Sequence, residues 1–211
     1  MRTLLLIGLL TACPSSMAPS VREGPRGPRA SDHYAAAREQ DELARERLTV
    51  PPEPRFEPGA QEMRVRPYQS RSTAAELERL ATTHRAQAAA LEEEYEEACG
   101  GVPFGKASSS PFRRYAIGSL NTDTGVMLYL RAGIQPEELQ TEIRCHRAWL
   151  MIAPSTSSDD SALDLPDLQL DVKRVTEGLS VSVTVDARLL PELRRRLARD
   201  LEAYRSVARA E

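Results

Sequence analysis

The sequence has little of several features that would identify a function directly. Basic and acidic residues are nearly balanced, 28 Lys and Arg against 31 Asp and Glu, so the charge indicates neither a nucleic-acid partner nor an acidic one. Beyond the first ten residues, no apolar run approaches the ~20 residues that cross a bilayer. The chain also has no G-x-S-x-G or S-x-x-K motif and no G-x-x-x-x-G-K-[ST] loop. We therefore expect a protein that is not an enzyme and holds no cofactor.

The first residues have the features of a secretory signal. Arg2 supplies a positive charge, and residues 3–10 contain five leucines and an isoleucine. This apolar core is too short to span a membrane. The segment Leu10-Thr11-Ala12-Cys13 resembles the bacterial lipobox, whose cysteine becomes the acylated N-terminus of the mature protein. The alternative is an ordinary secretory signal in which this cysteine has no role.

The lipobox resemblance implies a lipoprotein of the bacterial cell envelope. Residues 1–12 would be removed, and Cys13 would hold the chain at a membrane, facing the periplasm. Stable anchoring takes more than one acyl chain, because each buried methylene contributes only ~0.8 kcal/mol. Pro14 stands where an aspartate is associated with inner-membrane retention, which favours the outer membrane.

The composition of residues 13–72 predicts a disordered tether. The segment holds nine of the fifteen prolines and has almost no aliphatic periodicity, so it buries too little surface to offset its conformational entropy. A flexible tether of this length has a typical reach of ~40 Å. Within it, residues 31–48 are rich in Ala, Glu and Arg and could form a transient helix, which alone is marginal in water.

A folded domain is expected over residues 73–208. Thr73 and Glu76 form a capping box that predicts the start of a helix ending near Cys99, where Gly100 and Gly101 follow. The apolar positions expected on one face of this helix are Leu77, Leu80, His84, Ala88, Leu91, Tyr95 and Ala98. Further helices are expected from Pro136, with Leu139, Ile143, His146 and Leu150 buried, and from about Pro191, with Leu193, Leu197, Leu201 and Tyr204 buried.

Alternating apolar residues predict four strands in two hairpins. The first hairpin joins residues 113–119 to 126–131 through a turn at 121–125, and the second joins strands near 168–172 and 179–185 through a turn at 176–178. Each hairpin precedes a helix, which suggests a weak internal repeat or a chance similarity. The expected fold is α+β: a four-stranded antiparallel sheet with helices on one face.

Cysteine usage offers the best candidate for a functional or structural site. With Cys13 acylated, Cys99 and Cys145 remain in an oxidising compartment, where a disulfide between them is expected. The alternative is a periplasmic metal-binding protein in which Cys99, Cys145 and His146 bind a soft ion such as copper. The side chains of adjacent residues on a helix diverge by ~100°, which disfavours Cys145 and His146 as ligands of one ion.

The Cys-His pair on a helix, after an amphipathic helix that ends in cysteine, resembles uncharacterised proteobacterial lipoproteins. The resemblance covers about residues 75–205. In that group a histidine follows the Pro-Phe pair, whereas here Arg113 and Arg114 follow Pro111-Phe112, and a later cysteine is missing. The resemblance implies no activity. The sequence as a whole predicts a lipoprotein whose domain binds a protein or a cell-wall partner.

Overall fold

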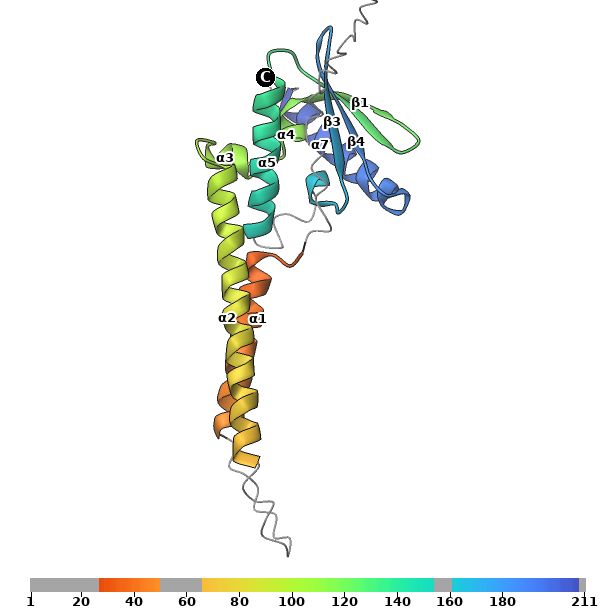
Figure 1. The fold of residues 1–211 in the computed structure, drawn as a ribbon. Helices are drawn as coiled ribbons and strands as arrows, with labels where there is room; N and C mark the ends of the chain where they lie inside the picture. Colours follow the sequence, from red (N-terminus) through yellow and green to blue (C-terminus); the bar gives the residue numbers. More distant parts are fainter. Residues whose placement is uncertain (1–26, 50–65, 154–160, 209–211) are drawn as a thin grey trace, which may run out of the picture.

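The computed structural model describes residues 27–49, 66–153 and 161–208, arranged as a long helical arm and an α+β body (Figure 1). The arm consists of helices α1 (Ala30–Thr49) and α2 (Arg66–Ala98), which lie side by side and run antiparallel. The body contains the sheet, α5 (Pro136–Ile152) and α7 (Leu190–Ala208). The two parts meet where the C-terminal end of α2 contacts α5.

Alanines at every seventh position form the contact between the two helices of the arm. Ala30, Ala37 and Ala44 are the buried residues of α1, and α2 buries Ala74, Ala81 and Ala88 opposite them. A seven-residue repeat keeps one seam of each helix facing its partner, as in a coiled coil. Side chains this small let the two helices approach closely. We call this contact the alanine seam.

The expectation of a tether over residues 13–72 is wrong for residues 30–49 and 66–72, which are helical. The helix around residues 31–48 lacks the apolar stripe that makes a helix recognisable in a sequence, but α2 supplies the packing that it lacks alone. Thr73 accordingly lies inside α2, so the capping box does not mark a helix start. The tether residues 13–26 and 50–65, and the signal residues 1–12, lie outside the described residues.

The sheet has four antiparallel strands in the order β1-β2-β4-β3. They are β1 (Ala116–Asn121), β2 (Gly125–Leu130), β3 (Gln169–Val175) and β4 (Gly178–Thr184). Each hairpin pairs within itself, and β2 and β4 join the hairpins at the centre. This is the expected fold class, with strand boundaries shifted by one to three residues.

Helices cover one face of the sheet. The core contains Val126, Leu128 and Leu130 of β2, together with Leu179, Val181 and Val183 of β4. Against them pack Leu139, Ile143 and Leu150 of α5 and Leu193, Leu197 and Leu201 of α7, all as expected. The side chain of Tyr204 lies outside the described residues.

Two short helices precede β1 and were not expected. Helix α3 (Phe104–Ala107) follows the end of α2, and α4 (Pro111–Tyr115) occupies residues assigned to the first strand. Pro111 is the first residue of α4, where its missing amide costs nothing. Phe112 and Tyr115 lie three residues apart and are both buried, which is a helical rather than an alternating pattern.

The two hairpin–helix units are related in structure as well as in sequence. Gly125 begins β2 and Gly178 begins β4. A Cβ added to Gly125 would lie 2.0 Å from the carbonyl oxygen of Val183, and one added to Gly178 would lie 2.5 Å from that of Leu130. Each carbonyl lies five residues after the glycine of its own strand. The internal repeat therefore coincides with a close backbone approach between β2 and β4 that only glycine permits at both positions.

Candidate functional site

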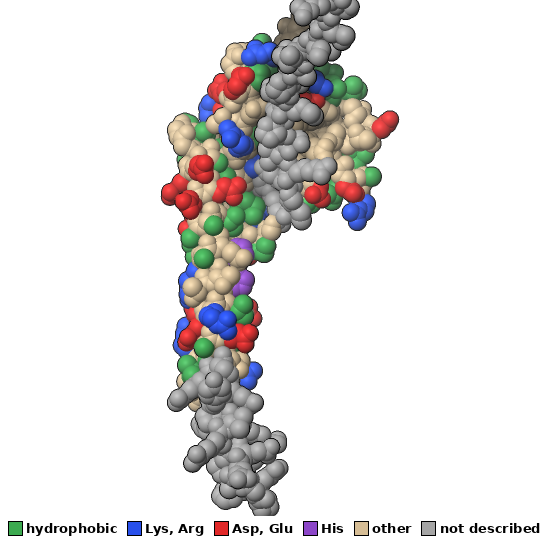
Figure 2. Space-filling view, in the orientation of Figure 1, with side chains coloured by type: hydrophobic (Ala, Val, Ile, Leu, Met, Phe, Trp, Pro, Cys, Tyr) green, Lys and Arg blue, Asp and Glu red, His purple; other side chains and the backbone are tan. Residues whose placement is uncertain are grey.

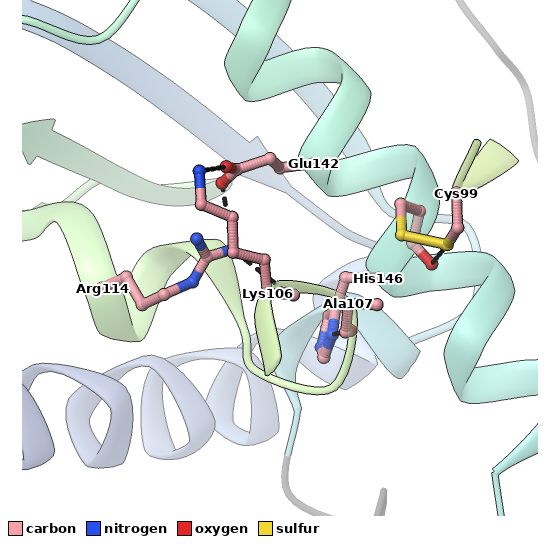
Figure 3. Close-up of a disulfide and its surroundings, with 7 residues drawn as sticks. Cys99, Lys106, Ala107, Arg114, Glu142 and His146 are labelled. Carbon is pink, nitrogen blue, oxygen red and sulfur yellow. Dashed lines mark hydrogen bonds and ion pairs between the residues drawn. A yellow bond between two sulfur atoms is a disulfide. The ribbon is translucent and has the colours of Figure 1, made fainter. Parts of the chain in front are cut away.

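A disulfide joins the arm to the body where α2 ends (Figure 3). Cys99 directly follows α2, and Cys145 lies fully buried within α5. Their Cα atoms are 4.6 Å apart, inside the range that a disulfide requires. Tyr95, Val102 and Ala107 pack around the two sulfur atoms. The pairing is the one expected from the sequence.

Next to the disulfide, the buried carboxylate of Glu142 binds three side chains, of which Lys106 and Arg114 are drawn in Figure 3. Lys106 Nζ lies 2.8 Å from Oε1, Arg114 Nη2 lies 2.9 Å from Oε2, and the Tyr115 hydroxyl donates to Oε1 at 3.0 Å. Arg114 also donates to the backbone carbonyl of Lys106. Glu142 therefore fastens α3 and α4 to α5.

The partners of Glu142 decide its ionisation. Burial by itself would raise the pKa of Glu142, but hydrogen bonds from Lys106 and Arg114 outweigh burial and hold the pKa below its ordinary value. The hydrogen bond to Glu142 raises the pKa of Lys106. The pKa of Tyr115 is raised mainly by burial, against the opposing effect of Arg114. At neutral pH the cluster holds a carboxylate, two cations and a neutral phenol.

His146 follows Cys145 in the chain, but its imidazole ring points away from the disulfide (Figure 3). Nδ1 lies 2.7 Å from the carbonyl oxygen of Ala107, so Nδ1 carries the proton and donates it. In the neutral ring Nε2 then accepts from the Ser161 hydroxyl at 3.1 Å. Ser161 Oγ also accepts from the amide of Leu163 and caps a short helical turn. We assign His146 a structural role, in which it holds the α3 segment and residue 161 against α5.

The alternative metal site of Cys99, Cys145 and His146 does not fit this arrangement. The two sulfur atoms are bonded to each other, so neither is a thiolate that could bind a metal. Both nitrogen atoms of His146 are engaged by Ala107 and Ser161. Elsewhere in the described ranges, no three residues among His, Cys, Asp and Glu gather closely enough to hold an ion.

A shallow cavity of about 370 Å³ lies beside the Glu142 cluster, between residues 101–103 and the first turns of α5. Lys106 and Glu142 line it and are paired with each other, while Glu138 adds a carboxylate 3.7 Å from Lys106 Nζ. Since these charges already have partners, we assign the cavity no ligand.

The face of the sheet opposite the helices carries an apolar patch on its β1–β2 half. Leu120 and Met127 are cross-strand partners, and Tyr129 pairs with Gly118. Ile117 is the extra residue at a bulge in β1 and is 49% exposed, and Leu120 is 54% exposed. We call these four apolar residues, Ile117, Leu120, Met127 and Tyr129, the open-face patch. The β3–β4 half of the same face is mostly polar, with Asp171, Lys173, Ser180, Ser182 and Thr184, and has an exposed Val175 at the end of β3.

Sequence reasoning missed both the Glu142 cluster and the open-face patch. The ligands of Glu142 lie 27 to 36 residues away along the chain, so no local pattern connects them. The open-face patch did leave a signal. Residues 126–130 are all apolar, whereas a strand with one solvated face alternates. Such a run indicates that the second face of the strand also carries apolar side chains, which a partner could cover.

Searches of protein-family models, curated proteins and solved structures find no match for this chain. Within the described ranges, none of the helices combines the length and the apolar character that a transmembrane segment needs.

Proposed function

We propose that this chain is a lipid-anchored protein of the bacterial cell envelope that faces the periplasm and acts by binding a protein partner. The anchor is the lipid on Cys13, and we favour the outer membrane over the inner membrane as its location. The single observation that carries the proposal is the buried Cys99–Cys145 disulfide, because structural disulfides belong to oxidising compartments. It supports export independently of the lipobox-like segment.

The place where the chain enters the fold limits how far the body can lie from the membrane. Arg29 Nη2 lies 3.0 Å from Asp164 Oδ2 in the body, just before α1 begins. Arg29 follows Cys13 by 16 positions, and a chain of that length spans at most about 55 Å. From there, the 20 residues of α1 extend the arm about 30 Å away from the body. The anchor therefore keeps the body near the bilayer, while the arm extends away from the body.

The open-face patch is the surface we assign to the partner. Large exposed apolar side chains gathered on one half of a sheet face, beside polar residues, are typical of protein–protein contacts. Of the four residues, three are aliphatic and one is Tyr129. A wall polymer is bound mainly through hydrogen-bonding groups, so this composition favours a protein over a glycan.

Site-specific photocrosslinking tests the binding surface in cells. A photoreactive residue at Leu120 is expected to give a discrete adduct with an envelope protein, and the separate variant Leu120→Glu is expected to weaken co-purification of that protein. The control is a photoreactive residue at Gln87, which is exposed on the arm. Identical adducts from both positions, or none from Leu120, would contradict the assignment.

Fractionation tests the anchor separately. Cys13→Ser is expected to move the protein from the membrane fraction to the soluble fraction or to leave it unprocessed. Ser15→Ala, two residues beyond the acylated position, is the matched control and should remain in the membrane fraction. Membrane attachment that persists in Cys13→Ser would overturn the proposed anchor and leave the binding surface to be judged by crosslinking.

A further inference from the structure

Two histidines face each other across the alanine seam. His33 of α1 lies midway between Ala30 and Ala37, and His84 of α2 lies midway between Ala81 and Ala88, so both occupy inward positions of the seven-residue repeat. Their Nδ1 atoms are 3.1 Å apart. The ring centroids are 5.4 Å apart with the rings tilted by 37°. Two helices far apart in sequence thus present the same nitrogen of two imidazoles to one point.

The separation of the two Nδ1 atoms suits two ligands of one metal ion. Ligating imidazole nitrogens lie about 2.0–2.1 Å from Zn²⁺. Two such ligands are about 3.3 Å apart in a tetrahedral complex and about 2.9 Å apart when they are neighbours in a square-planar one. The observed 3.1 Å lies between these values. In the metal-free protein, the same distance permits an N–H···N hydrogen bond from one ring to the other.

The residues around the histidine pair leave space for an ion beside the rings and leave the rings accessible from solvent. The residues above and below the pair in the seam are alanines, which do not cover the rings. Both histidines are partly exposed, and Figure 2 shows histidine side chains at the surface of the arm. The third histidine of the chain, His146, is buried and has both nitrogens engaged. His33 and His84 are therefore the accessible pair.

We propose that His33 and His84 bind one divalent transition-metal ion of the class that prefers imidazole, namely Cu²⁺, Zn²⁺ or Ni²⁺. The two nitrogens supply two ligands, and water or an external ligand fills the remaining positions. Because the residues are 51 positions apart in the chain, the ion links α1 to α2. Metal occupancy then stabilises the arm, in which the fully buried residues of the described seam are alanines. The site differs from the excluded cysteine set and is independent of the proposed anchor and partner.

Titration with Cu²⁺ tests the site in the full-length protein, purified in detergent without a histidine tag. Saturation at one ion per chain is expected. Pulsed electron paramagnetic resonance should detect two equatorial imidazoles in the wild type and at most one in His33→Ala or His84→Ala. Each single variant should lose the saturable binding to the same extent as the double variant. Gln40→Ala, which removes another partly buried side chain from the same helix, is the matched control and should bind as the wild type does.

Hydrogen exchange provides a second readout. Zn²⁺ is expected to slow amide exchange in α1 of the wild type and of Gln40→Ala, and to have no effect in His33→Ala. Circular dichroism verifies that each variant keeps its helices, since alanine suits both the helix and the seam. Absence of saturable Cu²⁺ binding, or binding that survives in the double variant, would overturn the proposal.

Discussion

Glu142 has only 3% of its side chain exposed and holds residues from α3 and α4 through ion pairs with Lys106 and Arg114. Replacing it with glutamine keeps the shape but leaves Arg114 without this counter-charge, and Lys106 with only the carboxylate of Glu138, 3.7 Å from Nζ. Because an unpaired charge near the interior is costly, we expect Glu142→Gln to lower the free energy of unfolding by about 2–3 kcal/mol. Denaturant titration measures the loss. Glu137→Gln, on the exposed side of the same helix, should change stability far less.

The lowered pKa of Glu142 predicts how this contribution depends on pH. A carboxyl whose pKa is lower in the folded state stabilises the protein above its unfolded-state pKa, ordinarily 4.5, and loses that contribution as the pH falls through the folded value. The stability difference between the wild type and Glu142→Gln should therefore be largest at neutral pH and shrink below about 4.5. A difference that stays constant on acidification would show that Glu142 contributes by shape rather than charge.

The glycines at the starts of β2 and β4 predict a second local effect. A methyl group at residue 178 would meet the backbone oxygen of Leu130, and its φ of +146° is one that side chains rarely adopt. We expect Gly178→Ala to cost about 1–3 kcal/mol of stability. Gly118→Ala in β1 is the control, since nothing lies within 4 Å of its added Cβ. Equal unfolding midpoints for the two variants would contradict the close approach of β2 and β4.

For individual residues, the sequence predicted the pairing of the cysteines but not the partners of the buried polar and charged side chains. The pairing of Cys99 with Cys145 follows by elimination once Cys13 is assigned to lipid. His146 could be placed on an apolar stripe, but its partners Ala107 and Ser161 could not be foreseen. The same holds for Asp200, which is 1% exposed and binds Ser110 and Arg113 at α4. Such contacts depend on which helices and strands pack against each other in the tertiary structure, and no local sequence pattern indicates that.

Among the elements, the arm depends most on small side chains. Ala81 has no exposed surface where α1 crosses α2. Ala81→Leu would push the helices apart, and overpacking of this kind costs about 1–3 kcal/mol. Limited proteolysis should then cut α1 faster than in the wild type. Gln87→Leu introduces the same side chain at an exposed position of the same helix and should leave the cleavage rate unchanged.

The disulfide is a covalent cross-link between arm and body, in addition to the backbone. Closing a loop with a sequence separation of 46 residues stabilises a fold by about 4 kcal/mol in the chain-entropy model. We expect Cys145→Ser, or reduction of the wild type, to lower stability by a few kcal/mol and to speed hydrogen exchange at the end of α2. The sheet should remain protected, because its core does not include the disulfide. Loss of the whole fold on reduction would contradict this division.

The elements that the sequence predicted well are those with a strong apolar period. Helices α5 and α7 and the strands β2 and β4 all bury a regular stripe against one core. Helix α1 was predicted only as a transient helix within the tether, because an alanine seam has almost no hydrophobic contrast. Leu80 was expected on the buried face of α2 but is 46% exposed, because the seam runs through Ala81 instead. The signal available in the sequence was the seven-residue spacing of the alanines in each helix.

In the whole molecule, the folded arm shortens the stretch of chain that can separate the proposed anchor at Cys13 from the body. A tether of about 60 residues would let the domain sample a wide zone. With α1 folded onto α2 and Arg29 paired with Asp164, only the residues between Cys13 and Arg29 would separate the proposed anchor from the body. A binding partner of the open-face patch is therefore expected close to the membrane, and the arm is the part that extends away from the body.

Mass spectrometry of the mature protein, isolated under non-reducing conditions from a bacterial envelope, tests the proposed anchor and the disulfide together. We expect an N-terminal peptide that begins at Cys13 and carries acyl mass, together with a disulfide-linked pair of peptides containing Cys99 and Cys145. A mature N-terminus at another residue, unmodified and soluble, with free thiols at Cys99 and Cys145, would contradict the proposal of a lipid-anchored envelope protein.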